Sequence, residues 1–264
     1  MGFVPKIDSG RGSESVDSAL ASIAEPVSSV SEAYRNIRTS LFFSIPAGSI
    51  KVLAVTSSGP AEGKTTTVTN LGFSIANSGK KALVIDADLH RPRIHKITEM
   101  EQSVGLTSVL IGESEFTQAV RKFVHNGKEV ENLHVLPAGP ESPNPAELLG
   151  SDKMKSLLCE ARNIYDWILI DTPPVLYVSD AAIISALCEG VMLVIEAGKN
   201  NRSMLVRTRE QLEDINVHII GAVLNNVVVS RAGRYYSDYY YHGYSRYSSD
   251  YKSAYYRADR KDET

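Results

Sequence analysis

Residues 57–66 have the composition of a loop that binds phosphate. They read SSGPAEGKTT, follow a short apolar run at 52–56 and open a stretch of helical periodicity at 65–77. Backbone N–H groups of such a loop, together with the start of the following helix, attract a polyphosphate. Lys64 would reach the β- and γ-phosphates, and the Thr65 hydroxyl would bind Mg²⁺. The expected nucleotide contacts are Ser58, Gly59, Pro60, Ala61, Glu62, Gly63, Lys64, Thr65 and Thr66.

The match to the strict pattern G-x-x-x-x-G-K-[ST] is imperfect, because Ser58 stands at its first position. A loop that links a strand to a helix is nevertheless where this motif binds phosphate. The position of the loop therefore carries the prediction.

Three aspartates follow apolar runs and complete the predicted chemistry. Asp171 ends the run 167–170, and Asp86 and Asp88 end the run 82–85. Residues two apart on an extended chain face the same side, so both carboxylates of the pair could reach the nucleotide. Carboxylates near Mg²⁺ bind it or accept a proton from an attacking hydroxyl. The predicted catalytic residues are Lys64, Asp86, Asp88 and Asp171, and the predicted metal ligands are Thr65, Asp86, Asp88 and Asp171.

A short basic run follows the aspartate pair, with Arg91, Arg93, His95 and Lys96 within six positions. Two interpretations stay open for it. It is either a solvated loop or a contact to phosphate or to an acidic partner.

The elements that must position these residues alternate between strands and helices. Continuous apolar strands separated by helices are typical of an α/β fold whose mostly parallel sheet has helices on both faces. We expect strands near 52–56, 82–85, 133–136, 167–170, 191–195 and 217–224, and helices near 65–77, 146–161 and 203–215.

The chain of 264 residues divides into three parts by composition. Residues 1–28 are rich in Ser and acidic residues and predict a flexible lead. Residues 29–229 predict one folded domain. Residues 230–264 contain almost no aliphatic side chains, so they predict a mobile tail that cannot build a core.

Tyrosines are concentrated in that tail. The chain has 13 tyrosines against 6 phenylalanines and 1 tryptophan, and only Tyr34, Tyr165 and Tyr177 lie outside the tail. The others are Tyr235, Tyr236, Tyr239, Tyr240, Tyr241, Tyr244, Tyr247, Tyr251, Tyr255 and Tyr256.

These motifs together resemble the bacterial tyrosine kinase (BY-kinase) family, the P-loop kinases of capsule and exopolysaccharide production. The segment 86–92, Asp-Ala-Asp-Leu-His-Arg-Pro, resembles the additional Walker A′ motif of that family, and 168–174 resembles its Walker B motif. The loop and the two acidic motifs are shared with the wider MinD/ParA-like superfamily, whereas the tyrosine cluster is typical of the kinases. His90 stands where family members often carry arginine.

The resemblance implies a protein-tyrosine autokinase that uses ATP and Mg²⁺ and phosphorylates the ten tail tyrosines, between subunits. It gives Glu32, Arg35 and Arg38 the role of an ExxRxxR motif that joins subunits into a ring, an octamer in the family. It also implies a membrane-embedded polysaccharide co-polymerase as activator, and a cognate tyrosine phosphatase.

The remaining expectations concern other classes of protein and the location. The net charge of -3 argues against bulk nucleic-acid binding. The chain has no apolar run near the roughly 18 residues of a membrane span, so we expect a cytoplasmic protein that a partner recruits to the plasma membrane. The main alternative is a MinD/ParA-like switch ATPase. That class usually carries a second lysine where this chain has Gly59.

Overall fold

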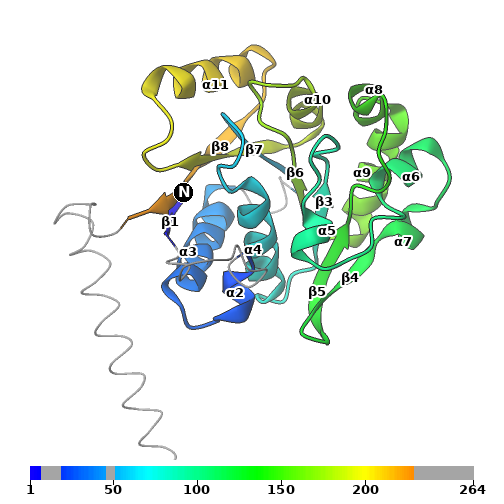
Figure 1. Ribbon diagram of the computed structural model, residues 1–264, viewed down its shortest axis with the longest axis horizontal. Coiled ribbons are helices and arrows are strands. Elements are labelled where there is room, and N and C mark those ends of the chain that lie inside the picture. Colours follow the sequence, from blue (N-terminus) through cyan, green and yellow to red (C-terminus); the bar gives the residue numbers. More distant parts are fainter. Residues whose placement is uncertain (7–18, 46–50, 229–264) are drawn as a thin grey trace, which may run out of the picture. The chain divides into compact units, whose positions relative to one another are not determined.

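The computed structural model describes residues 1–6, 19–45 and 51–228 (Figure 1). Its strands form one sheet in the order β1-β8-β7-β2-β6-β3-β5-β4. Strands β2, β3, β5, β6, β7 and β8 pair in parallel, whereas the edge strand β4 is antiparallel to β5. The predicted mostly parallel sheet is therefore confirmed. The strands are β1 (Gly2–Pro5), β2 (Val52–Ser57), β3 (Ala82–Asp86), β4 (Arg121–His125), β5 (Lys128–Leu136), β6 (Trp167–Asp171), β7 (Gly190–Glu196) and β8 (Ile219–Val227).

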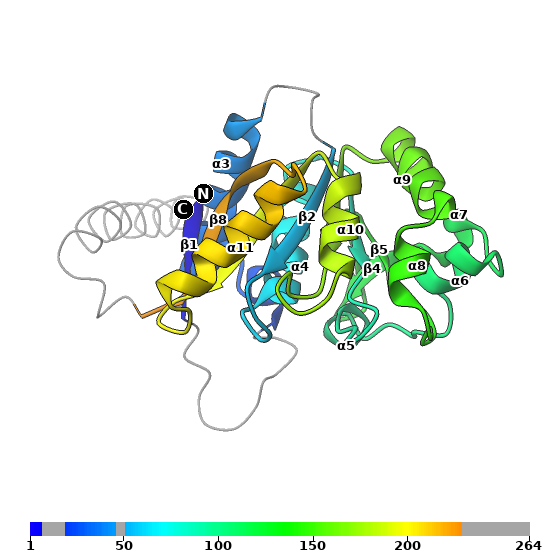
Figure 2. The same cartoon turned by 90° about the horizontal axis from the view of Figure 1, so that it is seen from above.

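Helices cover both faces of the sheet, as predicted (Figure 2). Side chains of β2 alternate between the two faces, because successive residues of a strand point in opposite directions. Val52 and Ala54 pack in the core beneath α9 to α11, and Leu53 and Val55 pack in the core beneath α3 and α4. The helices are α2 (Ala21–Ala24), α3 (Ser29–Ser44), α4 (Lys64–Ala76), α5 (Ile94–Ile97), α6 (Leu106–Ile111), α7 (Phe116–Ala119), α8 (Pro145–Leu149), α9 (Asp152–Ile164), α10 (Asp180–Leu187) and α11 (Arg202–Asp214).

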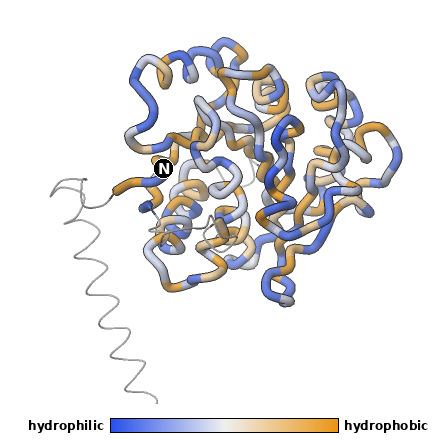
Figure 3. The backbone as a smooth tube through the Cα atoms, in the orientation of Figure 1, coloured by the Kyte–Doolittle hydropathy of each residue, from blue (hydrophilic) through white to orange (hydrophobic). Residues whose placement is uncertain are grey.

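The helix predicted at 146–161 is wrong as a single element. Helix α8 ends before Gly150, and Ser151 caps α9 by accepting a hydrogen bond from the Met154 N–H at 3.3 Å. A serine that caps a new helix interrupts the preceding one. The break is not visible in the apolar spacing, because that spacing continues across both helices. The connection before α11 is largely hydrophilic (Figure 3).

The N-terminal residues correct the prediction of a flexible lead over 1–28. Strand β1 joins the edge of the sheet, and the Met1 amino group donates to the Ala222 carbonyl oxygen at 3.1 Å. The buried Asn70 side chain of α4 accepts from the Ser22 N–H at 2.8 Å and donates to the Ala19 carbonyl oxygen at 2.7 Å. The prediction of a lead is therefore wrong for 1–6 and 19–28, because distant elements supply the partners that order these residues. Residues 7–18 lie outside the described residues.

The chain divides into a unit at residues 1–226 and a second unit at 227–264. The predicted tail at 230–264 and its ten tyrosines lie outside the described residues. Within the described residues, no helix combines the length and the apolar composition that crossing a bilayer requires.

Candidate active site

The phosphate loop, residues 58–63, connects β2 to α4 and ends on Gly63, the N-cap residue of α4. Ala61 and Gly63 adopt left-handed backbone conformations with φ of 56° and 88°. The first N–H that enters the helix is that of Thr67, which donates to the Gly63 carbonyl oxygen at 2.8 Å. In the described part of the chain, the backbone N–H groups of residues 61–66 have no hydrogen-bond partner. These N–H groups, which we call the anion cradle, are available to a phosphate.

Gly63 has no room for a side chain. A Cβ at this position would lie 2.0 Å from Asn225 Nδ2, and its φ of +88° is strained for other residues. We expect Gly63→Ala to weaken nucleotide binding about 10-fold or more, because the loop must shift away from Asn225. Binding of a fluorescent ADP measures this. Gly79→Ala is the matched control, since Gly79 has a φ of +82° with nothing within 4 Å. An equal loss of affinity in both variants would contradict the expectation.

Asp171 and Thr65 meet beside the cradle. The Thr65 hydroxyl donates to Asp171 Oδ2 at 2.6 Å, while the buried Oδ1 atom has no partner among the described residues. Burial raises the pKa of Asp171 to about 7, and nearby Lys64 and the Thr65 hydrogen bond oppose the shift. Lys64 is itself 7% exposed. The predicted lysine, threonine and aspartate are thus brought together by adjacent elements.

Asp86 and Asp88 lie close to Asp171 but in different surroundings. Asp86 is fully buried and neighbours Asp171 in the register of β3 and β6. Its Oδ2 atom accepts from the N–H groups of Arg93 at 3.1 Å and Ile94 at 3.0 Å. Burial and the charge of Asp171 raise the pKa of Asp86 well above its usual range. Asp88 is half-buried, and its Oδ1 atom accepts from the Arg91 N–H at 3.0 Å.

One cavity of about 1410 Å³ unites most of the predicted residues. Its lining includes Asp88, all four members of the basic run, and Pro60, Ala61, Gly63, Lys64, Thr65 and Thr66 of the predicted nucleotide contacts. The other predicted residues, Ser58, Gly59, Glu62, Asp86 and Asp171, do not line this cavity. Ser58 and Glu62 are almost fully buried, and Ser58 Oγ lies 2.9 Å from Thr208 Oγ1.

Two asparagines are among the cavity residues that the sequence does not predict. Asn225 and Asn226 come from the end of β8 and line the same cavity. The sequence feature that indicates them is a pair of polar residues at the C-terminal end of an apolar strand, because ligands bind at these strand ends in parallel sheets.

The carboxylates fit a Mg²⁺ ion that arrives with phosphates. Within the described residues, no group of three or more His, Cys, Asp or Glu side chains forms a metal site by itself. Mg²⁺ typically takes one or two carboxylates and completes its shell with water and substrate phosphates. The unpartnered Oδ1 atom of Asp171 and the Thr65 hydroxyl could hold such an ion, with Asp86 and Asp88 nearby.

The predicted oligomer residues lie on α3, and all three have partners within the chain. Arg35 Nε donates to Glu32 Oε2 at 2.6 Å, and its Nη1 donates to the Pro26 carbonyl oxygen at 3.1 Å. Arg38 Nη1 donates to the Ser74 carbonyl oxygen of α4 at 2.6 Å. Glu32 and Arg35 keep about a third of their side chains exposed, at 34% and 37%.

Comparison with known proteins identifies the family. A family model described as an AAA domain matches residues 50–216. The tyrosine-protein kinase YwqD of Bacillus subtilis is 41% identical over 88% of this chain and 94% of that protein. The chain belongs to the bacterial tyrosine kinases. The putative tyrosine-protein kinase CapB of Staphylococcus aureus is 36% identical over 82% of this chain and 92% of that protein.

Solved structures agree with this family and with its wider fold. The kinase domain of the Escherichia coli tyrosine kinase ETK has a TM-score of 0.79 and 32% identity, and covers 88% of this kinase and 91% of that chain. The cell division ATPase MinD of Pyrococcus furiosus has a TM-score of 0.56 and 26% identity, with 70% and 73% covered. The predicted MinD/ParA-like P-loop fold and the predicted protein-tyrosine kinase activity are thereby confirmed. The fold implies nucleotide binding.

The tyrosines of the folded part are mostly inaccessible to any active site. Within the described residues, Tyr34 and Tyr165 are 1% and 5% exposed, and Tyr177 is 63% exposed. Burial raises the pKa of both buried hydroxyls, that of Tyr165 to about 12. Within the described part of this kinase, Tyr177 is therefore the one exposed tyrosine, and it can serve as a control in phosphorylation experiments.

Proposed function

We propose that this kinase transfers the γ-phosphoryl group of ATP to tyrosines of its C-terminal cluster, between copies of the chain. The observation that carries the proposal is the single cavity that contains the anion cradle, Lys64, Thr65 and Asp88. Ten tyrosines crowd positions 235–256 of the same chain. Each copy of the chain therefore carries acceptor tyrosines that the active site of a neighbouring copy would use. Residues 29–229 would form the kinase domain, and 230–264 the acceptor tail.

The reaction is an in-line displacement. The bond between the γ-phosphorus and the β,γ-bridging oxygen breaks, the tyrosine oxygen bonds to phosphorus, and ADP leaves. The phenolic proton passes to a carboxylate. Lys64 and the anion cradle would hold the β- and γ-phosphates, and a bound Mg²⁺ would neutralise developing charge.

The carboxylates would divide the work according to their surroundings. Asp171 and Thr65 would hold the metal ion, because Asp171 has an oxygen atom without a partner among the described residues. Asp88 lines the cavity and would orient the acceptor hydroxyl and take its proton. Asp86 would contribute charge to the metal position while its Oδ2 atom holds the segment that carries the basic run.

The assembly and its partners belong to the same proposal. Glu32 and Arg35 would contact a neighbouring copy in a ring-like oligomer, with Arg38 fixing α3 on α4. A membrane-embedded polysaccharide co-polymerase would recruit and activate the kinase at the inner face of the plasma membrane, and a tyrosine phosphatase would reverse the reaction. Each phosphate adds about -1.5 to -2 charges, so heavy phosphorylation of the tails would loosen the ring and regulate polysaccharide export.

A mixing experiment tests transfer between copies. One chain carries Lys64→Met and an intact tail, and the other carries Lys64 and phenylalanine at all ten tail positions. We expect neither chain alone to gain phosphotyrosine with ATP and Mg²⁺, and the mixture to gain it only on the Lys64→Met chain, since each chain lacks one half of the reaction. Phosphotyrosine mapping by mass spectrometry measures this, and Tyr177→Phe in both chains should change nothing.

Two results would contradict this proposal separately. If the mixture of the two variants gains no phosphotyrosine while the wild-type chain alone does, transfer occurs within one chain. A wild-type chain without phosphotyrosine, even with a membrane activator, would exclude the tail as acceptor.

A further inference from the structure

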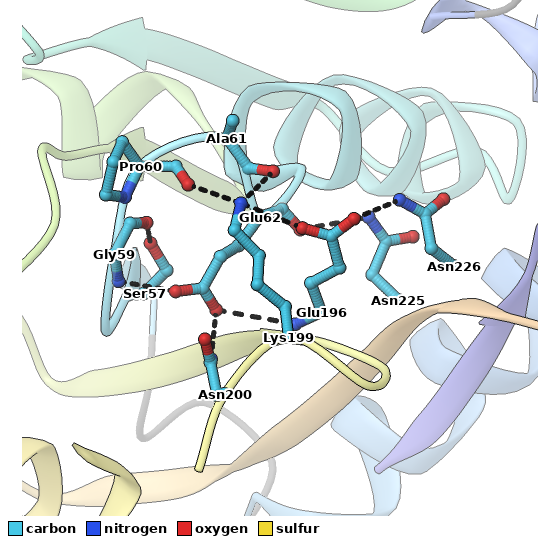
Figure 4. A network of polar contacts seen from close by, with 10 residues as sticks. All are labelled: Ser57, Gly59, Pro60, Ala61, Glu62, Glu196, Lys199, Asn200, Asn225 and Asn226. Carbon is cyan, nitrogen blue, oxygen red and sulfur yellow. Dashed lines mark hydrogen bonds and ion pairs between the residues drawn. The ribbon is translucent and has the colours of Figure 1, made fainter.

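The outer side of the phosphate loop is held by side chains from distant parts of the chain (Figure 4). Lys199, in the connection between β7 and α11, donates from Nζ to the carbonyl oxygens of Pro60 at 2.8 Å and Ala61 at 3.2 Å. Asn225 of β8 donates from Nδ2 to the Glu62 carbonyl oxygen at 3.0 Å. Three consecutive carbonyl groups of the loop are therefore bound by two residues.

These contacts to the carbonyl oxygens also determine where the N–H groups of the same peptide units point. The C=O and N–H of a trans peptide unit point in opposite directions within one plane. With the carbonyls of residues 60–62 turned toward Lys199 and Asn225, the N–H groups of residues 61–63 point away from them. These N–H groups are the first three of the anion cradle, and they have no partner in the described part of the chain.

The remaining contacts fix Lys199 and close the network. Glu196 Oε2 lies 2.9 Å from Lys199 Nζ, and Glu196 Oε1 accepts from Asn226 Nδ2 at 3.1 Å. The Glu62 carboxylate, fully buried, accepts from the Gly59 N–H of its own loop and from Asn200 Nδ2 at 2.7 Å. The loop is thus tied to one short connection, residues 196–200, and to the end of β8.

We propose that Lys199 is a positioning residue for the phosphate loop, which orients the anion cradle toward the β- and γ-phosphates before nucleotide binds. Lys199 is absent from the cavity lining, unlike Asn225 and Asn226, so it acts through the loop. The inference rests on the proposed function only in naming ATP as the source of the phosphates. Without Lys199, two carbonyls would turn to water and the peptide planes would lose their common orientation, which has to be restored on binding.

The test compares Lys199→Met and Lys199→Arg with the wild-type chain. Fluorescent ADP gives the dissociation constant without any acceptor, which separates this test from the proposed tail phosphorylation. We expect Lys199→Met to weaken ADP binding about 5- to 20-fold, and to raise the KM for ATP by a similar factor with kcat within about twofold, because binding is lost equally in ground and transition states. Lys199→Arg, which keeps the donors, should recover at least half of the loss in logarithmic terms.

Controls separate orientation from charge and from folding. Lys155→Met removes another exposed ion pair, the 2.7 Å contact to Asp152, and should leave ADP binding unchanged. The loss in Lys199→Met should persist at about 0.5 M salt, where interactions between separated exposed charges are screened. Glu196→Gln removes the carboxylate that binds Lys199 and should weaken ADP binding about 2- to 5-fold. This variant replaces Lys199→Met in the test if Lys199→Met unfolds below the assay temperature.

Three results would overturn the proposal. They are unchanged ADP affinity in Lys199→Met, a loss that disappears at high salt, and a loss that Lys155→Met reproduces. If Lys199→Met cannot be assayed, unchanged affinity in Glu196→Gln has the same meaning.

Discussion

Replacing Lys64 with methionine is expected to lower tyrosine phosphorylation at least about 100- to 1,000-fold. Removal of one preorganised group that stabilises transition-state charge has an effect of this size. Lys64 is nearly buried at the start of α4, beside the cradle and Asp171. Its ammonium also holds down the pKa of Asp171, so Lys64→Met would leave the carboxylate more readily protonated and less able to support a metal.

Two measurements check this expectation. Phosphotyrosine formation with saturating ATP and Mg²⁺ reports the transfer, and thermal unfolding without nucleotide reports whether the fold is intact. Lys155→Met is the matched control, and it should transfer phosphate at the wild-type rate. An unfolding temperature near that of the wild type together with a loss below about 10-fold would show that Lys64 does not stabilise the transferred group.

Replacing Asp171 with asparagine is expected to abolish transfer while making stability less dependent on pH. Asparagine keeps an acceptor for the Thr65 hydroxyl but removes the charge that a divalent ion needs, so a loss of at least about 100-fold is expected. The same change removes a buried carboxyl group whose pKa is raised to about 7.

The sign of the pH effect follows from that raised pKa. The folded chain keeps the Asp171 proton up to about pH 7, whereas the unfolded chain releases it near the ordinary value of 3.8. Stability of the wild type therefore falls as the pH rises between these values, because the folded state binds more protons. Between pH 5 and 8, the free energy of unfolding of Asp171→Asn should improve relative to wild type by about 2–3 kcal/mol.

Denaturant unfolding at several pH values, without Mg²⁺ or nucleotide, measures this difference. Asp152→Asn is the control, because Asp152 is exposed and its hydrogen bond to Lys155 lowers its pKa. Its removal should change the pH dependence only slightly, and in the opposite direction. A pH-independent difference between Asp171→Asn and wild type would mean that Asp171 is ionised in the folded protein at pH 5.

The alternation of strands and helices is predictable from the sequence, because the apolar residues within each element follow the periodicity of that element. Strand β2 and helix α4 formed where the apolar pattern placed them, so the loop between them was correctly positioned. The split between α8 and α9 escaped prediction, because the capping serine interrupts the backbone while the apolar spacing continues. Strand β1 escaped it too, since a lone four-residue strand is ordered only by the sheet edge it joins.

The sequence by itself determined the phosphate loop, the three aspartates and the tyrosine cluster, because each is a contiguous pattern or ends a recognisable strand. Only the tertiary structure decided which residues stand behind that loop. Lys199 and Asn225 reach it from 138 and more positions away along the chain. The order of parallel strands brings them there, and that order depends on packing between helices and sheet rather than on local spacing. The same packing buries Asp86 and Asp171 side by side, which raises both pKa values.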